Sequence, residues 1–100
     1  MSKQSKTLLS AVVATGAGTA VEVQDERYFT FYIEPTGTVD MTVKIQSLAP
    51  SGNWVAIDSR TLTTATSFVV QVVGRFTQIR ANVTTWVNGT LTVGMESASS

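Results

Sequence analysis

The last third of the chain, residues 74–93, constrains the fold most strongly, because it predicts two strands joined by a tight turn. The turn is Asn88-Gly89, and apolar residues alternate with polar ones on both sides of it. Both turn residues tolerate the positive φ angles of a type I′ turn, and Asn-Gly between alternating runs is the strongest short-range signal of a β-hairpin. The stretch therefore predicts an all-β chain.

Two further stretches show the period of two that a strand with one buried face requires. In residues 38–46 apolar and polar residues alternate, and residues 27–34 follow a similar pattern. Such alternation is typical of antiparallel sheets with one face toward solvent. Between them, Pro35-Thr36-Gly37 has the composition of a turn. The core residues that we expect are Phe29, Phe31, Val39, Met41, Val43, Ile45, Phe68, Val70 and Leu91, with Val55 and Ile57 also facing inward.

With the remaining segments of this kind, the chain holds about eight short strands, and no stretch has the helical period of 3.6 residues. We therefore predict an all-β, antiparallel β-sandwich, either a jelly roll or a Greek key. Residues 1–6 are expected to form a flexible N-terminal arm, and residues 7–96 a single domain. Residues 97–100 are expected to be a C-terminal tail that frays.

The composition excludes several classes of function. The chain has no cysteine and no histidine, and its 7 acidic residues balance its 7 basic ones. Nucleophile–histidine pairs are therefore impossible, and zinc and copper lose their best ligands. Basic residues scattered among acids do not make a nucleic-acid surface, and no apolar run approaches the about 20 residues of a membrane helix. We expect no enzymatic activity, no catalytic residue, no cofactor, no metal, and neither nucleic acid nor membrane as a partner.

The N-terminus imitates a secretory signal only loosely. Lys3 and Lys6 precede the apolar run 8–14, but this run is at the lower limit of length and Ser10 interrupts it. We therefore expect a chain that is made in the cytoplasm of its host.

The acidic residues suggest solvated surface charge rather than a catalytic pair, because nothing in their spacing singles out two of them. The aromatic residues leave an alternative function open. Trp54, Tyr28 and Tyr32 are candidates for a stacking platform of a carbohydrate-binding or adhesion module. Trp86 stands beside the predicted turn and is the aromatic residue that we most expect to be exposed.

From residue 52 onward the chain carries a series of motifs in a characteristic order. They are Gly52-Asn53-Trp54-Val55, Gly74-Arg75-Phe76, Ile79-Arg80-Ala81-Asn82-Val83-Thr84 and Gly89-Thr90-Leu91-Thr92-Val93. This order resembles that of the small β-sandwich accessory proteins of tailed-phage virions, over residues 51–93. The first half of the chain matches this group only in its pattern of strands and turns.

The resemblance implies a non-enzymatic structural protein of the virion, in particular a capsid decoration (cement) protein that clamps neighbouring capsid subunits. Tail, neck and fibre components contain related domains and remain an alternative. The implied location is the capsid surface, and the implied partners are the major capsid protein or another virion protein and further copies of the chain, as a homotrimer. Self-association is also favoured by the apolar residues on nominally outer faces, which are Tyr28, Tyr32, Val69, Val73 and Trp86. We expect contacts with a partner at Lys3 and Lys6 in the arm, and at Trp86 and Asn88.

Overall fold

The computed structural model describes residues 3–24 and 26–99, and these form seven strands and no helix, which confirms the predicted all-β class. All pairings between the strands are antiparallel. The strands are β1 (Lys3–Val12), β2 (Gly16–Ala17), β3 (Val21–Glu22), β4 (Tyr28–Leu48), β5 (Trp54–Leu62), β6 (Phe68–Val73) and β7 (Gln78–Ala98).

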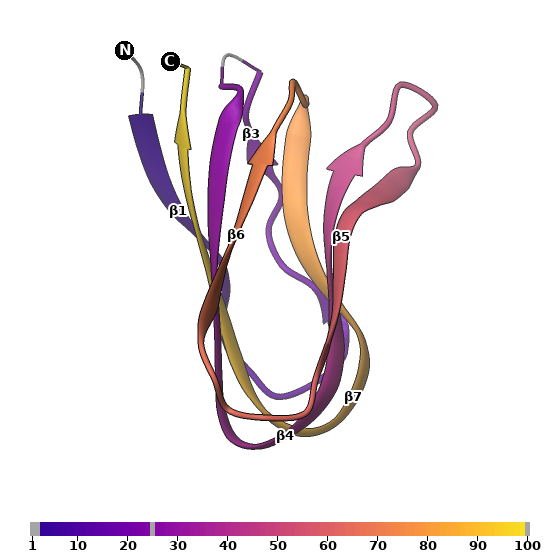
Figure 1. Cartoon of the computed structure of the whole chain (residues 1–100). Coiled ribbons are helices and arrows are strands. Elements are labelled where there is room, and N and C mark those ends of the chain that lie inside the picture. Colours follow the sequence, from indigo (N-terminus) through magenta and orange to yellow (C-terminus); the bar gives the residue numbers. More distant parts are fainter. Residues whose placement is uncertain (1–2, 25, 100) are drawn as a thin grey trace.

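Two long strands organise the fold. β4 and β7 are 21 residues each, and they pair along almost their whole length, from Tyr28 opposite Ala98 to Ser47 opposite Ile79. This ribbon is folded over, so that each of the two strands runs through both layers of the molecule (Figure 1). The first layer has the order β1, β7, β4, β6, and the second layer consists of β2 and β3, then β7, β4 and β5.

The bend in the ribbon corrects the predicted hairpin turn. Asn88-Gly89 does not join two strands but lies inside β7, and Pro35-Thr36-Gly37 lies inside β4. The two segments face one another across the ribbon, where Thr36 pairs with Thr90 and the register then shifts three times before it becomes regular. Extra residues of this kind bend a strand pair. Gly37 and Gly89 have φ angles of 84° and 105°, which favour glycine. The two turn signals therefore bend one ribbon together instead of reversing the chain twice.

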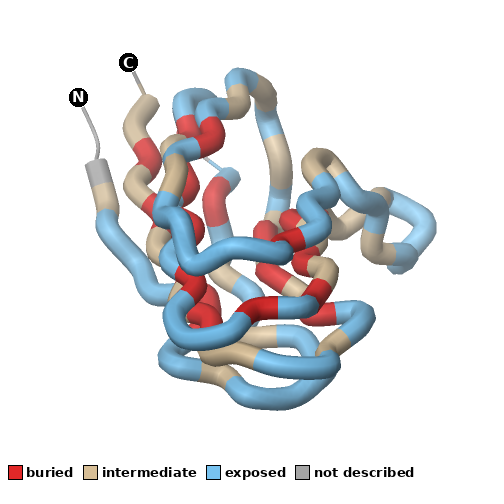
Figure 2. The backbone as a smooth tube through the Cα atoms, turned by 60° about the horizontal axis from the view of Figure 1, so that its bottom comes forward, coloured by how far each residue is buried: buried red, intermediate tan, exposed pale blue. Residues whose placement is uncertain are grey.

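The core fills the space between the two layers, and it confirms most of the predicted buried residues. Phe29, Phe31 and Ile33 face inward in the first layer, and Met41, Val43 and Ile45 do so in the second. Buried positions alternate with exposed ones along β4 and lie toward the inside of the fold (Figure 2). Of the other expected core residues, Val39, Val70 and Leu91 are buried and Phe68 is half-buried.

Strand β5 departs from the predicted alternation. Val55 was expected to face inward, but it is 53% exposed, and Ile57 is half-buried. β5 contains an extra residue, because Ile45 pairs with Asp58 and the next residue, Gln46, pairs with Ala56, so that Ile57 has no position opposite it in the ladder. Val55 instead lines an open hollow of about 630 Å³ together with Phe76 and the loop after β4.

The first and last described segments belong to the sheet, at positions where a flexible arm and a tail were expected. Residues 3–7 of β1 pair with residues 94–98 of β7, and Ser97 is buried. The buried carboxylate of Glu26 accepts hydrogen bonds from Gln4 Nε2 and, at 3.3 Å, from Ser97 Oγ, so that it ties the first and last strands to the turn before β4. Met1, Ser2 and Ser100 lie outside the described residues.

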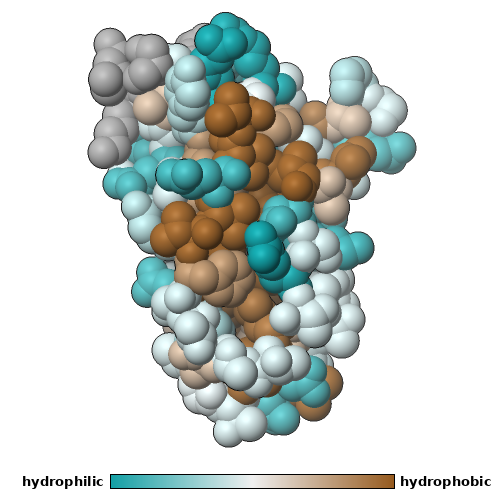
Figure 3. Space-filling model, in the orientation of Figure 1, coloured by the Kyte–Doolittle hydropathy of each residue, from teal (hydrophilic) through white to brown (hydrophobic). Residues whose placement is uncertain are grey.

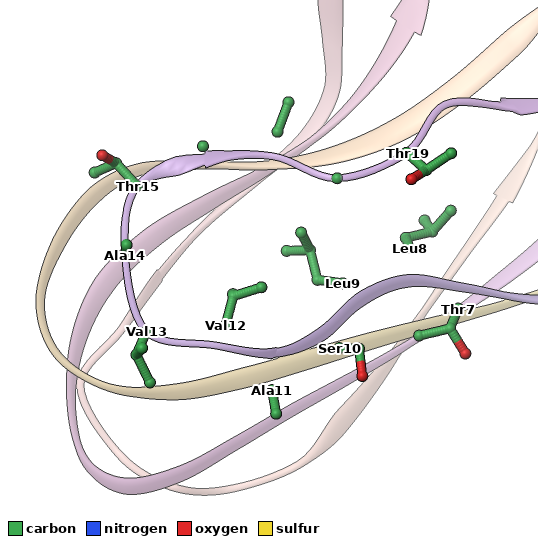
Figure 4. A pocket seen from close by; sticks show the side chains of 13 residues that line it. Thr7, Leu8, Leu9, Ser10, Ala11, Val12, Val13, Ala14, Thr15 and Thr19 are labelled. Atoms are coloured by element: carbon green, nitrogen blue, oxygen red, sulfur yellow. The ribbon is translucent and has the colours of Figure 1, made fainter.

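Residues 7–19 cross from the first layer to the second in two arms, an outgoing arm formed by the end of β1 and a returning arm that contains β2. Leu8, Leu9 and Val12 point into the space between the two arms, while Ser10 and Ala11 point away (Figure 4). The returning arm is held by the amide of Gly18, which donates to the carbonyl oxygen of Ala81 at 2.8 Å. The open hollow between the arms has a volume of about 600 Å³ and contains no charged side chain.

Candidate interaction surface

The described part of the chain contains no cluster of potential metal ligands. Among residues 3–24 and 26–99, no three His, Cys, Asp or Glu side chains come close enough together to hold a metal ion. The one buried carboxyl group there, that of Glu26, has hydrogen-bond donors, as a buried polar group requires. No helix in this part of the chain is long and apolar enough to cross a membrane. The features that remain to be explained are surfaces.

The four residues expected to contact a partner do not come together. Lys6 is exposed on β1 and pairs with Met95, and the backbone of Lys3 pairs with Ala98. Asn88 is exposed at the bend of the ribbon, at the other end of the molecule (Figure 1). Because Asn88 and Met95 are seven residues apart on one strand, the lysines lie roughly 20 Å from the bend. The structure therefore does not assemble these residues into one site.

Trp86 is half-buried, which corrects the expectation of an exposed side chain. Its indole Nε1 donates a hydrogen bond of 2.9 Å to the carbonyl oxygen of Gly89. The side chain also packs against the buried core. Trp86 thus closes the bend of β7 on itself, and its role in the described structure is to stabilise that bend.

Four exposed apolar side chains gather on the outer face of the first layer, and we call them the tyrosine–valine patch. They are Tyr28, Tyr32, Val69 and Val73, with exposed fractions of 45%, 37%, 53% and 69%. Tyr28 stands opposite Val73 in the ladder between β4 and β6, and Tyr32 stands opposite Val69. Hydrophobic side chains form a stripe over β6 in the space-filling view (Figure 3). Contiguous exposed patches of this kind mark interaction surfaces more often than scattered apolar residues do.

Polar contacts fix both tyrosines of the patch. The hydroxyl of Tyr32 donates a hydrogen bond of 2.7 Å to the carboxylate of Glu96. This bond, and the negative charge of Glu96, raise the pKa of the Tyr32 phenol above its ordinary value. The guanidinium of Arg27 lies 5.9 Å from the centre of the Tyr28 ring, within the range of a cation–π interaction. Both rings are thus held against the sheet with one side toward solvent.

The opposite outer face does not provide the carbohydrate platform that was considered. Trp54 pairs with Leu48 in the second layer, whereas Tyr28 and Tyr32 belong to the first. The guanidinium of Arg80 lies 4.2 Å from the centre of the Trp54 ring, and Arg80 Nε donates to Gln46 Oε1 at 2.8 Å. One face of the Trp54 ring is therefore covered by Arg80, and the three aromatic residues lie on two different surfaces.

Comparison with known proteins places the fold but not a family. No family model and no curated protein matches the sequence. Among solved structures, the SPBc2 prophage-derived protein YomS is similar with a TM-score of 0.76 and 19% identity, over 96% of this chain and 92% of that chain. PirA is similar with a TM-score of 0.55 and 18% identity, over 96% of this chain and 93% of that chain.

A third similar structure is that of Bacillus endospore appendages, which are described as disulfide-linked pili. The TM-score is 0.50 and the identity 19%, over 99% of this chain and 85% of that chain. The present chain has no cysteine, so it lacks the residue that a disulfide link needs. All three similarities cover nearly the whole of this chain.

Proposed function

We propose that the protein is a non-enzymatic structural subunit of a virion, and specifically a capsid decoration protein that binds where capsid subunits meet. The observation that carries this proposal is the similarity to the prophage-derived protein YomS along nearly the full length of both chains. A shared fold alone does not determine function, so the proposal also depends on the surfaces. Tail, neck or fibre components and extracellular appendages are the neighbouring possibilities within the same structural class.

The surfaces support a protein that acts by contact. The described residues form no metal-binding cluster, whereas an apolar patch and exposed strand edges lie on the outside of a sheet that is tied together at both ends. A decoration protein needs a rigid scaffold of this kind. By binding the assembled shell and not its separated subunits, it stabilises the shell by about 2.7 kcal/mol at a hundredfold excess over the dissociation constant.

The experiment is immunogold labelling of purified particles from the source of the chain, with an antibody against the recombinant protein. A regular distribution of gold over the capsid surface is the expected result. Gold confined to the tail, neck or fibres supports the structural role and rejects decoration. Particles that carry no label, from a culture in which the protein is produced, reject the virion role altogether. Particles from a strain without the gene serve as the matched control.

The number of copies that associate is a separate question. The resemblance to decoration proteins implies a homotrimer, whereas the open edge of β6 favours a pair of chains. The mass of the free protein in solution distinguishes the two.

A further inference from the structure

The two layers expose several strand edges, and all but one carry features that prevent pairing with another chain. Proteins protect such edges with charged residues, bulges or very short strands. β1 carries Lys6 and two irregularities in its register, and β2 and β3 are two residues each. β5 contains the extra residue Ile57, and Asp58 and Arg60 form an ion pair of 2.9 Å on it.

Strand β6 has none of these protections. Its six residues, Phe68–Val73, include no charged residue, no proline and no glycine. Its ladder with β4 is regular from Tyr28 opposite Val73 to Ile33 opposite Phe68. Such a strand, regular, uncharged and rich in valine, is a template for another strand. The tyrosine–valine patch lies on the outer face of the same strand and its neighbour.

The direction of the backbone groups of β6 follows from one hydrogen bond. The amide of Gly74 donates to the carbonyl oxygen of Arg27 at 2.9 Å, in line with the register of the ladder between β4 and β6. Backbone groups of successive residues in a strand point to opposite edges. The residues of β6 that bond to β4 are therefore Phe68, Val70 and Val72. The N–H and C=O groups of Val69, Gln71 and Val73 point to the open edge.

We propose that β6 pairs with β6 of a second copy of this chain, antiparallel and about a two-fold axis at Gln71. This inference deepens the proposed function, because it names the self-contact of the structural subunit. In this register Gln71 faces Gln71 of the second copy, and Val69 faces its Val73. Val69, Gln71 and Val73, whose backbone groups point to the open edge, then all form hydrogen-bonded pairs with the second copy, and each pair exchanges two bonds. A shift by one residue would set inward side chains against outward ones.

The same register makes the tyrosine–valine patch self-complementary. Tyr28 and Val73 are neighbours across the ladder of one chain, and Val69 and Tyr32 are neighbours in the second copy. Because Val73 faces Val69 of the second copy, these four side chains form one row across the interface. The two-fold axis produces an identical row on the other side of the central glutamines. Cross-strand rows of aromatic and β-branched side chains stabilise antiparallel sheets. The first layers of two chains would thus form one continuous sheet, with no like charges opposed between the two β6 strands.

The available area fits an association of moderate strength. Pairing at the edge brings Val69 and Val73 of the two copies together, whereas Tyr28 and Tyr32 stand on β4, one strand further from the axis, and keep their outer faces toward solvent. The contact is therefore smaller than the about 800 Å² per partner that a stable interface buries. The paired strand edge and the half-buried Phe68 and Val72 beside it contribute area as well. We therefore expect a dissociation constant in the micromolar range, where a concentration series resolves it.

The first test is the mass of the free protein by sedimentation equilibrium, from about 1 to 300 μM. The expected result is a reversible transition from 10.7 kDa to twice that mass. Gln71→Pro removes the N–H at the two-fold axis without breaking a bond to β4, and edge strands tolerate proline at such positions. It should leave the protein monomeric at all concentrations. Gln71→Ala keeps the N–H and is the matched control, with the dimer retained.

The second test reads the register directly, and it does not depend on how well the proline variant folds. The chain has no cysteine, so Gln71→Cys introduces a single thiol per copy. Across the axis the two Cα atoms would be about 5.5 Å apart, which suits a disulfide. Val73→Cys is the control, because the two copies of residue 73 would lie about 13 Å apart along the strand. Under mild oxidation only Gln71→Cys should form a covalent dimer rapidly.

Two lysine variants, one in the patch and one outside it, test the contribution of the patch to the dimer. Val69→Lys places an ammonium group opposite Val73 of the second copy and should weaken the dimer about tenfold or more. Val87→Lys is the control, since Val87 is exposed to a similar degree, 52%, but lies at the bend of β7 away from β6. It should change the dissociation constant less than about twofold.

Three results would overturn the pairing: a protein that stays monomeric over the whole range, a trimer whose mass Gln71→Pro does not change, or a Gln71→Cys variant that fails to cross-link. If the natural partner of β6 were a strand of a different protein, the free chain would also stay monomeric in the sedimentation experiment. None of these results bears on the immunogold experiment, so the pairing and the virion role can fail independently.

Discussion

Gly18 offers a sharp test of how the crossing segment is held. A Cβ atom on Gly18 would lie 1.9 Å from the carbonyl oxygen of Leu8 and 2.8 Å from Leu9 Cδ2. Ordinary contact begins at 3.4 Å, so the segment must move away from Leu8 by about 1.5 Å. The first obstacle is backbone, which cannot turn aside as a flexible side chain can. Gly18→Ala therefore separates two parts of the fold that now touch.

The cost of this movement can be worked from the contacts that it disturbs. A lost hydrogen bond between Gly18 and Ala81 would cost about 1 kcal/mol. Partial exposure of Leu8 and Leu9, which are now buried, would add about 1–3 kcal/mol, since full burial of one leucine is worth about 1.5–3 kcal/mol. We expect a total loss of about 2–4 kcal/mol in the free energy of unfolding. In a chain of this size that corresponds to a fall of roughly 10–25 °C in the melting temperature.

The measurement is thermal and urea unfolding followed by far-UV circular dichroism. Gly94→Ala is the control, because no atom lies within 4 Å of its Cβ position and its φ is not positive. This control should change the unfolding free energy by less than about 0.5 kcal/mol. If Gly18→Ala melted together with Gly94→Ala, the close approach of the crossing segment to Leu8 would be refuted.

Three further predictions concern the core, the patch and the bend. Val43→Ala should cost about 1–3 kcal/mol, and Val43→Asp should prevent cooperative unfolding, because the side chain is fully buried; a normal melt for the aspartate variant would contradict the register of β4. The raised pKa of Tyr32 means that its contribution to stability is complete below the unfolded pKa of about 10 and disappears as the pH rises through the folded pKa. Ultraviolet titration should therefore show a phenol that ionises late, absent in Tyr32→Phe and earlier in Glu96→Gln. Trp86→Phe should cost about 1 kcal/mol through the lost bond to Gly89, and Trp54→Phe, which loses no indole bond of this kind, should cost less in the same denaturant titration.

The sequence predicted the strands better than it predicted their connections. The period of two along β4 identified which side chains face the core, because burial of one face requires alternation whatever the partner is. Gly37 and Gly89 correctly indicated that the backbone bends at two places. Their local signals did not contain the pairing between segments about fifty residues apart, and it is this pairing that turns two expected hairpins into one folded ribbon.

The ends and the candidate surface show the same limit. Residues 3–6 are polar and have no pattern of a buried strand, yet backbone pairing with β7 incorporates them into the sheet. The patch residues were recognisable as apolar positions on outer faces. Their arrangement beside one another depends on the register between β4 and β6, which composition and period do not specify. The expectation of an exposed Trp86 was wrong because its indole donates a hydrogen bond to the backbone of the same strand, at Gly89.

The position of β7 in the chain has a consequence for synthesis. It follows the other six described strands in the chain, yet β1, β2, β3 and β4 all form ladders with it. A ribosome delivers about 5–20 residues per second from the N-terminus. The strands β1, β2 and β3, which pair with β7 alone among the described strands, therefore wait without a partner until residues 78–98 emerge. During that interval the valine-rich β6 is exposed to other nascent chains. We expect a chain stalled before residue 78 to stay sensitive to protease on the ribosome, and a chain whose residues 78–98 have emerged to become resistant.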